Sequence, residues 1–143
     1  MRFACNIILV AVAACGGSPS AAVETSGSVA PDAVRLVWSV SAGEGDLVDV
    51  SLAIGDKTVH VGTISGASDD AVAPLATCSA NGGTKTSELH CGGTPEYSYF
   101  LASLEGTNLV VTRVSGVEGQ KERRAEVTRA PVRASSLVTA PLR

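Results

Sequence analysis

The chain has 143 residues, a formal net charge of −3 and only 17% charged residues. This length suits one domain rather than two. The positive mean hydropathy excludes disorder throughout the chain, and the small net charge excludes the strong positive field of a nucleic-acid-binding protein. The apolar residues are mainly Val and Ala, with many Gly, Thr and Ser, a composition typical of strands joined by tight turns.

Residues 1–14 have the pattern of an export signal. Arg2 supplies a positive charge, and residues 3–14 are apolar except for Cys5 and Asn6. This stretch fits the apolar region of a signal peptide and is too short to span a bilayer. Residues 15–31, CGGSPSAAVETSGSVAP, have the Gly-, Ser-, Ala- and Pro-rich composition of a flexible linker after the cysteine.

The segment Val12-Ala13-Ala14-Cys15 resembles the lipobox of bacterial lipoproteins, which reads aliphatic, small, small, Cys. The resemblance covers the signal peptide alone. It implies cleavage by signal peptidase II before Cys15, a diacylglycerol on the Cys15 thiol, and a further acyl chain such as palmitate on the new amino group. An ordinary secretory signal that happens to contain a cysteine is the alternative.

Two or more acyl chains hold a protein firmly to a membrane, so lipidated Cys15 predicts an anchored cell-envelope protein. Gly16, rather than Asp, follows the cysteine. In Gram-negative members of the resembled family this implies the outer membrane, facing either the periplasm or the cell surface. The expected organisation is a signal peptide at 1–14, lipidated Cys15 and linker at 15–31, and a β domain at 32–143 with a frayed C-terminal tail.

Three alternating segments begin the domain. Apolar side chains recur at alternate positions in residues 34–40, with Val37 the exception, in residues 48–54, and at Val59 and Val61 in residues 58–64. A period of two with short connections, such as the turn Gly55-Asp56-Lys57, predicts an antiparallel meander with one apolar face. Trp38 is expected in the core because it lies on the apolar side of its segment. His60 is expected at the surface because it lies on the side of its own segment that points away from the core.

Two cysteines remain in the domain once Cys5 leaves with the signal peptide and Cys15 takes lipid. In an exported, oxidising setting Cys78 and Cys91 are expected to form a disulfide. Asn81-Gly82-Gly83 lies between them and favours a turn, so the pair predicts a hairpin or broad loop stapled at its base.

His90 beside Cys91 raises the alternative of a metal site. The spacing of Cys78 and Cys91 is not that of a zinc finger, and adjacent residues of an extended segment point to opposite faces. The disulfide is therefore preferred, and no metal or other cofactor is predicted.

The second half of the domain completes the strand pattern. A short strand is expected through Cys78 and others in residues 88–91, 96–104, 109–115 and 123–129. Residues 105–108 (Glu-Gly-Thr-Asn) predict a further hairpin turn. The total of seven to eight short strands without a helical period predicts an all-β fold, an antiparallel β-sandwich or small barrel.

Motifs that carry chemistry are weak in this chain. Residues 82–87 (GGTKTS) lack the Gly that precedes Lys in a phosphate loop, and residues 62–66 (GTISG) are not a nucleophile elbow. Carboxylates in two turns suit calcium but lack EF-hand spacing, which favours solvated turns at Glu44, Asp46, Asp49, Asp69 and Asp70. Tyr97 and Tyr99 share a strand face, where they either stack on a sugar ring or cover a neighbouring strand.

Charge is distributed unevenly. Residues 16–112 hold eleven acidic and three basic side chains, whereas residues 113–143 hold seven basic and three acidic ones. The simplest interpretation is two solvated surfaces. The alternative is that the basic region contacts anionic envelope polymers or lipids. This alternative requires that Arg123, Arg124 and Arg129 cluster on one exposed face.

These features predict a lipid-anchored binding or structural module of the cell envelope, with a membrane attachment, no nucleic acid and an undefined protein or polymer partner. The chain is not expected to be an enzyme, because no Ser-His-acid, metal or nucleophile motif is visible. The alternative is an envelope hydrolase whose site is assembled only in the fold.

Overall fold

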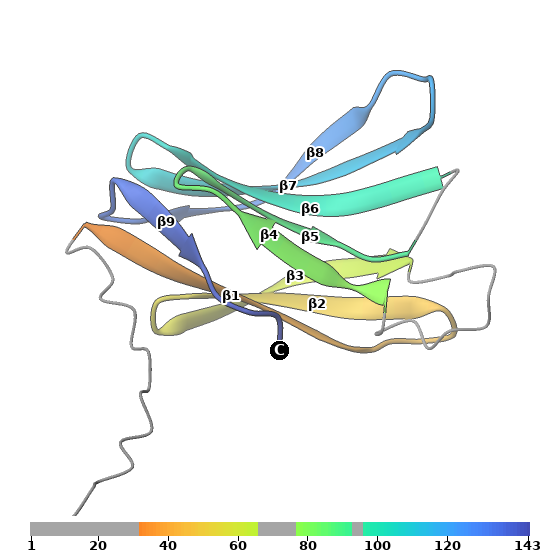
Figure 1. Cartoon of the computed structure of the whole chain (residues 1–143), viewed down its shortest axis with the longest axis horizontal. Coiled ribbons are helices and arrows are strands. Elements are labelled where there is room, and N and C mark those ends of the chain that lie inside the picture. The colour runs from red at the N-terminus through yellow and green to blue at the C-terminus, as the bar shows by residue number, and fades with distance from the viewer. Residues whose placement is uncertain (1–31, 66–76, 93–95) are drawn as a thin grey trace, which may run out of the picture.

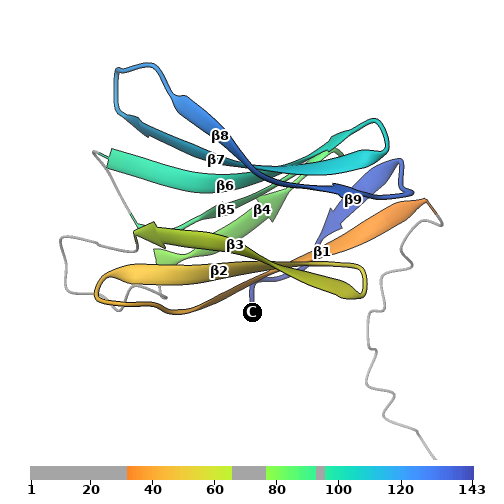
Figure 2. The same cartoon turned by 180° about the vertical axis from the view of Figure 1, so that it is seen from behind.

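The structure is a computed structural model, and it describes residues 32–65, 77–92 and 96–143. The described residues form nine strands in two sheets packed face to face (Figures 1 and 2). The strands are β1 (Ala33–Ala42), β2 (Leu47–Ile54), β3 (Lys57–Ser65), β4 (Ser79–Gly82), β5 (Thr86–His90), β6 (Glu96–Glu105), β7 (Asn108–Val117), β8 (Arg123–Pro131) and β9 (Ser136–Thr139).

The two sheets have the orders β3-β2-β1-β9 and β4-β5-β6-β7-β8. Every pair of neighbouring strands is antiparallel except β1 and β9, which are parallel. The predicted all-β class and the β-sandwich are confirmed. None of the described residues lies in a helix that could cross a bilayer.

The predicted hairpins are present. Gly55 and Gly106 have φ values of 61° and 59°, which suit glycine in the tight turns between β2 and β3 and between β6 and β7. The turn predicted at residues 81–83 lies instead at residues 83–85, because Asn81 and Gly82 continue β4 and pair with β5.

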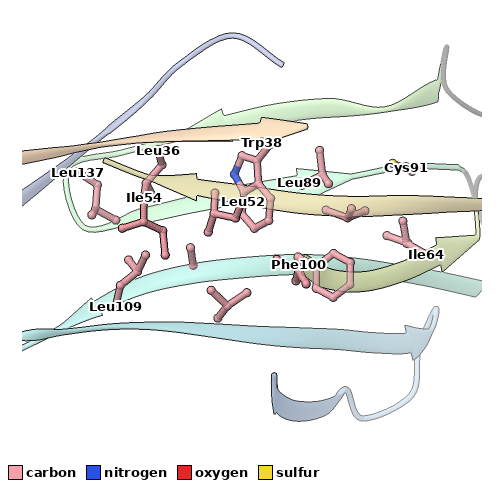
Figure 3. Close-up of a cluster of buried hydrophobic side chains, with 14 of the residues drawn as sticks. Leu36, Trp38, Leu52, Ile54, Ile64, Leu89, Cys91, Phe100, Leu109 and Leu137 are labelled. Carbon is pink, nitrogen blue, oxygen red and sulfur yellow. The ribbon is translucent and has the colours of Figure 1, made fainter. Parts of the chain in front are cut away.

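The core fills the space between the sheets (Figure 3). Trp38 is completely buried, as predicted, and its ring stacks on that of Phe100 from the opposite sheet at a centroid distance of 6.5 Å. Phe100 is a second aromatic anchor that the strand pattern alone did not distinguish. Around them, apolar residues at alternate positions of both sheets are buried, including Leu36, Leu52, Leu89 and Leu109.

One edge of the sandwich is tied together by a buried polar cluster. The Ser87 hydroxyl on β5 accepts a hydrogen bond from Trp38 Nε1 (2.8 Å) and another from the Thr139 hydroxyl (2.9 Å). Ser87 is the buried polar side chain of the described core. These two bonds join the five-stranded sheet to β1 and β9 of the other sheet, and we call this side, with strands β4, β5 and β9, the closed edge.

The C-terminal segment belongs to this closed edge, so the prediction of a frayed tail is wrong. β9 pairs in parallel with β1, and the Arg143 backbone exchanges hydrogen bonds with Trp38 and Val40. The segment was not recognised as a strand because its pattern is short. It is held by a neighbour about a hundred residues away in the chain, with buried Leu137 on its inner side. This strand also brings the total to nine rather than seven to eight.

The opposite side is the open edge, formed by the β7–β8 hairpin. β3 is the last strand of the four-stranded sheet and contacts β6, so β7 and β8 extend beyond it (Figures 1 and 2). The first five residues of β8 are all exposed. Arg113 of β7 pairs with buried Phe100 and is nevertheless exposed, because none of the described strands covers this part of the inner face.

Candidate binding face

The site residues predicted from the sequence are three cysteines. Cys15 and the rest of the lipobox lie outside the described residues. Cys78 and Cys91 form a disulfide, as predicted. They lie immediately beyond the Ser79–His90 pair that begins the β4–β5 hairpin, so the bond closes the base of that hairpin.

The isolated candidates remain isolated. His60 is exposed on β3, as predicted. Glu44 and Asp46 lie exposed in the connection between β1 and β2, and Asp69 and Asp70 fall outside the described residues. Across residues 32–65, 77–92 and 96–143, no group of three His, Cys, Asp or Glu side chains is placed to hold a metal ion.

The phosphate-loop-like segment 82–87 has a structural role. It forms the end of β4, the turn and the start of β5 rather than a loop before a helix. Lys85 Nζ donates to the Ser135 carbonyl at 2.5 Å, and the Leu137 amide donates to the Thr84 carbonyl at 2.8 Å. The segment therefore holds β9 in place.

The largest group of polar and aromatic side chains lies on the outer face of the five-stranded sheet. Tyr97 and Tyr99 alternate with buried Phe100 on β6, so both point away from the core. His90 is paired with Tyr99 across β5 and β6 and therefore shares this face. We call His90, Tyr99 and Tyr97 the aromatic row.

The three rings of the row are nearly parallel. The His90 and Tyr99 rings have centroids 4.4 Å apart and planes inclined by 19°. Tyr97 and Tyr99 have centroids 6.4 Å apart and planes inclined by 24°. The His90 side chain is 43% exposed, and both tyrosines are half-buried.

The row covers the neighbouring strand β7. A Cβ added at Gly116 would lie 2.7 Å from the Tyr97 hydroxyl oxygen, so Tyr97 leans over the space that this glycine leaves. Val114 is paired with Tyr99 on the same face and is completely buried, although it lies outside the main core cluster. The tyrosine pair therefore covers a neighbouring strand with its buried side, as one of the two interpretations predicted.

Charged side chains surround the row. Glu88 Oε2 lies 2.9 Å from His90 Nε2, and Glu122 Oε2 lies 3.1 Å from Arg124 Nη2. The Tyr97 hydroxyl donates to Glu122 Oε1 at 3.3 Å. The sequence identifies Glu88 only as part of a predicted strand and Glu122 only as one of several acidic side chains. Their place beside the row depends on strand register, which the sequence does not state.

The pKa values of three of these side chains are shifted. Partial burial and then the negative charge of Glu122 raise the pKa of both Tyr97 and Tyr99 above 10.0. The hydrogen bond to Glu122 raises the pKa of Arg124. At neutral pH both phenols of the row therefore stay protonated, and the Arg124 guanidinium beside the row stays charged.

The basic C-terminal region does not form one patch. Arg124 and Arg129 pair with Val114 and Val110 on the outer face, and each binds a nearby glutamate. Arg123 pairs with Ser115 and shares the opposite face with Arg113. The cluster of Arg123, Arg124 and Arg129 required by the anionic-partner hypothesis is absent.

The described chain is thus a small disulfide-bonded β-sandwich with one polar, aromatic sheet face open to solvent. Comparison with protein-family models, with curated proteins and with solved structures finds no match for the chain. Its function has to be argued from this face and from the N-terminal sequence.

Proposed function

We propose that the protein is a lipid-anchored binding module of a bacterial envelope. Cys15 carries the acyl chains, residues 16–31 form the tether, and the β-sandwich presents the aromatic row and its charged neighbours to a partner. The lipobox Val12-Ala13-Ala14-Cys15 supports the anchor. The observation that carries the binding role is the solvent-facing group of three rings, two carboxylates and one guanidinium on a single sheet face.

Binding fits this face better than a purely structural role. A sheet face without a ligand is usually covered by scattered polar side chains. Here three rings with polar atoms at their edges adjoin one another, and such side chains combine a large contact area with hydrogen-bonding groups and lose little conformational entropy on binding.

The anchor is tested by metabolic labelling of cells that express the whole chain. Wild-type protein is expected to incorporate labelled palmitate, and Cys15→Ser is expected to incorporate none. Globomycin, an inhibitor of signal peptidase II, is expected to make the unprocessed precursor accumulate. Cys5→Ser is the matched control, because Cys5 lies within the signal peptide. A mature chain that begins anywhere other than at an acylated Cys15 contradicts the proposal.

A further inference from the structure

We propose that the aromatic row binds an uncharged oligosaccharide of the envelope, with a sugar ring against the tyrosines and its hydroxyls bonded to Glu88, Glu122 and Arg124. This inference rests on the proposed function, since it names the ligand of the same face. It uses residues from β5, β6 and the β7–β8 hairpin that strand register places side by side.

The rings match one side of a sugar. A pyranose presents a face of C–H groups and a rim of hydroxyls. Aromatic side chains with a polar atom at one end fit such a ligand, because the ring packs on the C–H face and the polar atom remains in reach of the rim. Tyr97 and Tyr99, whose planes are inclined by only 24°, give two such rings in succession along β6.

The polar groups match the other side. Glu88 uses Oε2 toward His90, and Arg124 uses Nη2 toward Glu122. Within the described residues, Glu88 Oε1 and the Tyr99 hydroxyl have no hydrogen-bond partner. The face therefore offers both donors and acceptors, and a sugar hydroxyl, which donates one hydrogen bond and accepts others, uses both kinds.

Charge favours a neutral ligand. Arg124 neutralises Glu122, and Glu88 faces His90, so the described strands place no unpaired cation beside the row to attract a phosphate or an acidic polymer. A protein partner would require an apolar centre. Of the large apolar side chains that are exposed in the described residues, Leu47 and Val138 are on the other sheet, and Val127 is isolated at the bulge of β8.

The described domain begins on the sheet opposite the row. The chain enters the domain at β1, which belongs to the four-stranded sheet, whereas the row lies on the outer side of the five-stranded sheet (Figures 1 and 2). A domain held through residues 15–31 can therefore turn the row toward an envelope polymer.

The test is a titration of the full-length protein in detergent micelles with four neutral tetrasaccharides: cellotetraose, chitotetraose, maltotetraose and mannotetraose. Nuclear magnetic resonance is expected to show saturable shifts at Tyr97, Tyr99 and His90 with at least one of them, and unchanged Trp38 signals. Tyr99→Ala is expected to weaken that affinity by about tenfold or more. His60→Ala, a change at an exposed histidine on the other sheet, is expected to leave it unchanged.

Tyr99 also covers Val114, so its truncation can disturb the fold. Glu122→Gln and Tyr97→Phe alter polar groups without removing a ring, and each is expected to weaken binding severalfold while Trp38 fluorescence stays native. Absence of binding to all four sugars, or binding that these variants leave intact, overturns the inference.

The outcomes separate this inference from the proposed function. Cross-linking through the row to an envelope protein, abolished by Tyr99→Ala and without any glycan binding, would reject the sugar and keep the binding face. Failure of the wild-type protein to incorporate palmitate at Cys15 is an independent result that would reject the anchor alone.

Discussion

The two edges of the sandwich are held in different ways. At the closed edge, β4, β5 and β9 are joined by the Cys78–Cys91 disulfide and by the buried Ser87 hydroxyl. Further hydrogen bonds link the turn at residues 84–85 to Ser135 and Leu137. At the open edge, β8 has β7 as its neighbour in the sheet, and most of its side chains are exposed.

The difference shows where a small core needs reinforcement. β4 and β9 have four residues each, and such short strands bury little apolar surface. Covalent and buried polar links compensate at this edge. β8 is longer and is protected from pairing with other chains by a bulge opposite Val111–Thr112, by its charges and by Pro131.

The largest expected effect is removal of the disulfide. Replacing both Cys78 and Cys91 by Ser is expected to lower the free energy of unfolding by about 3 kcal/mol, because the bond closes a segment with a sequence separation of 13. Urea denaturation followed by Trp38 fluorescence measures this. Val127→Ser on the open edge is the control and is expected to cost less than about 0.5 kcal/mol. Equal losses in the two variants would contradict the contrast between the edges.

The next effect concerns Ser87. Ser87→Ala leaves the indole N–H of Trp38 and the Thr139 hydroxyl without their buried partner, and it is expected to cost about 1–3 kcal/mol. Ser103→Ala removes a half-buried serine from the outer face of β6 and serves as the control. The cluster does not stabilise the closed edge if both variants unfold at the same urea concentration.

Gly82 gives a more local test of the same edge. A Cβ at Gly82 would overlap the Thr139 side chain, so Gly82→Ala is expected to displace β9 and cost about 1–3 kcal/mol. At Gly83 an added Cβ would meet only Thr86 Oγ1 at 4.0 Å. Gly83→Ala is therefore expected to be neutral or slightly stabilising. Hydrogen exchange of the β9 amides separates the two, and similar protection in both variants would exclude close β4–β9 contact.

The smallest effect is expected at the open edge. The hydrogen bond from Arg129 lowers the pKa of Glu126 from 4.5, so this carboxylate stabilises the fold above its unfolded pKa and loses that effect as pH falls through its folded pKa. Arg129→Gln is expected to return the pKa of Glu126 toward 4.5, measured by magnetic resonance titration. Its small stability deficit is expected at neutral pH and to disappear in acid. An unchanged pKa would show that the pair is not formed.

The strands themselves were predictable because their signal is local. The alternation in residues 34–40, 48–54 and 58–64, together with glycines at the turns, identified the meander and placed Trp38 inside. The disulfide was predictable by elimination among four cysteines. β9 was missed because a four-residue strand carries too few alternating positions, and what fixes it is its parallel contact with β1.

The aromatic row was half predictable. Tyr97 and Tyr99 share a face by the period of two, but His90, Glu88, Glu122 and Arg124 come beside them only through the pairing of β5 with β6 and of β7 with β8. A shift of one residue in either register would send these side chains to the opposite face. Similarly, Gly82 resembled a turn residue and is instead the point where β4 approaches Thr139.

By itself, then, the sequence determined every strand except β9, the buried side of the first three and the cysteine pair, because side-chain alternation and turn chemistry act over a few residues. The tertiary structure alone decided how the hairpins are arranged in two sheets, that the last strand completes the first sheet, and that three rings, two carboxylates and one guanidinium meet on one face. Those outcomes depend on contacts between residues distant in the chain, whose free energy is gained only when both sheets have formed.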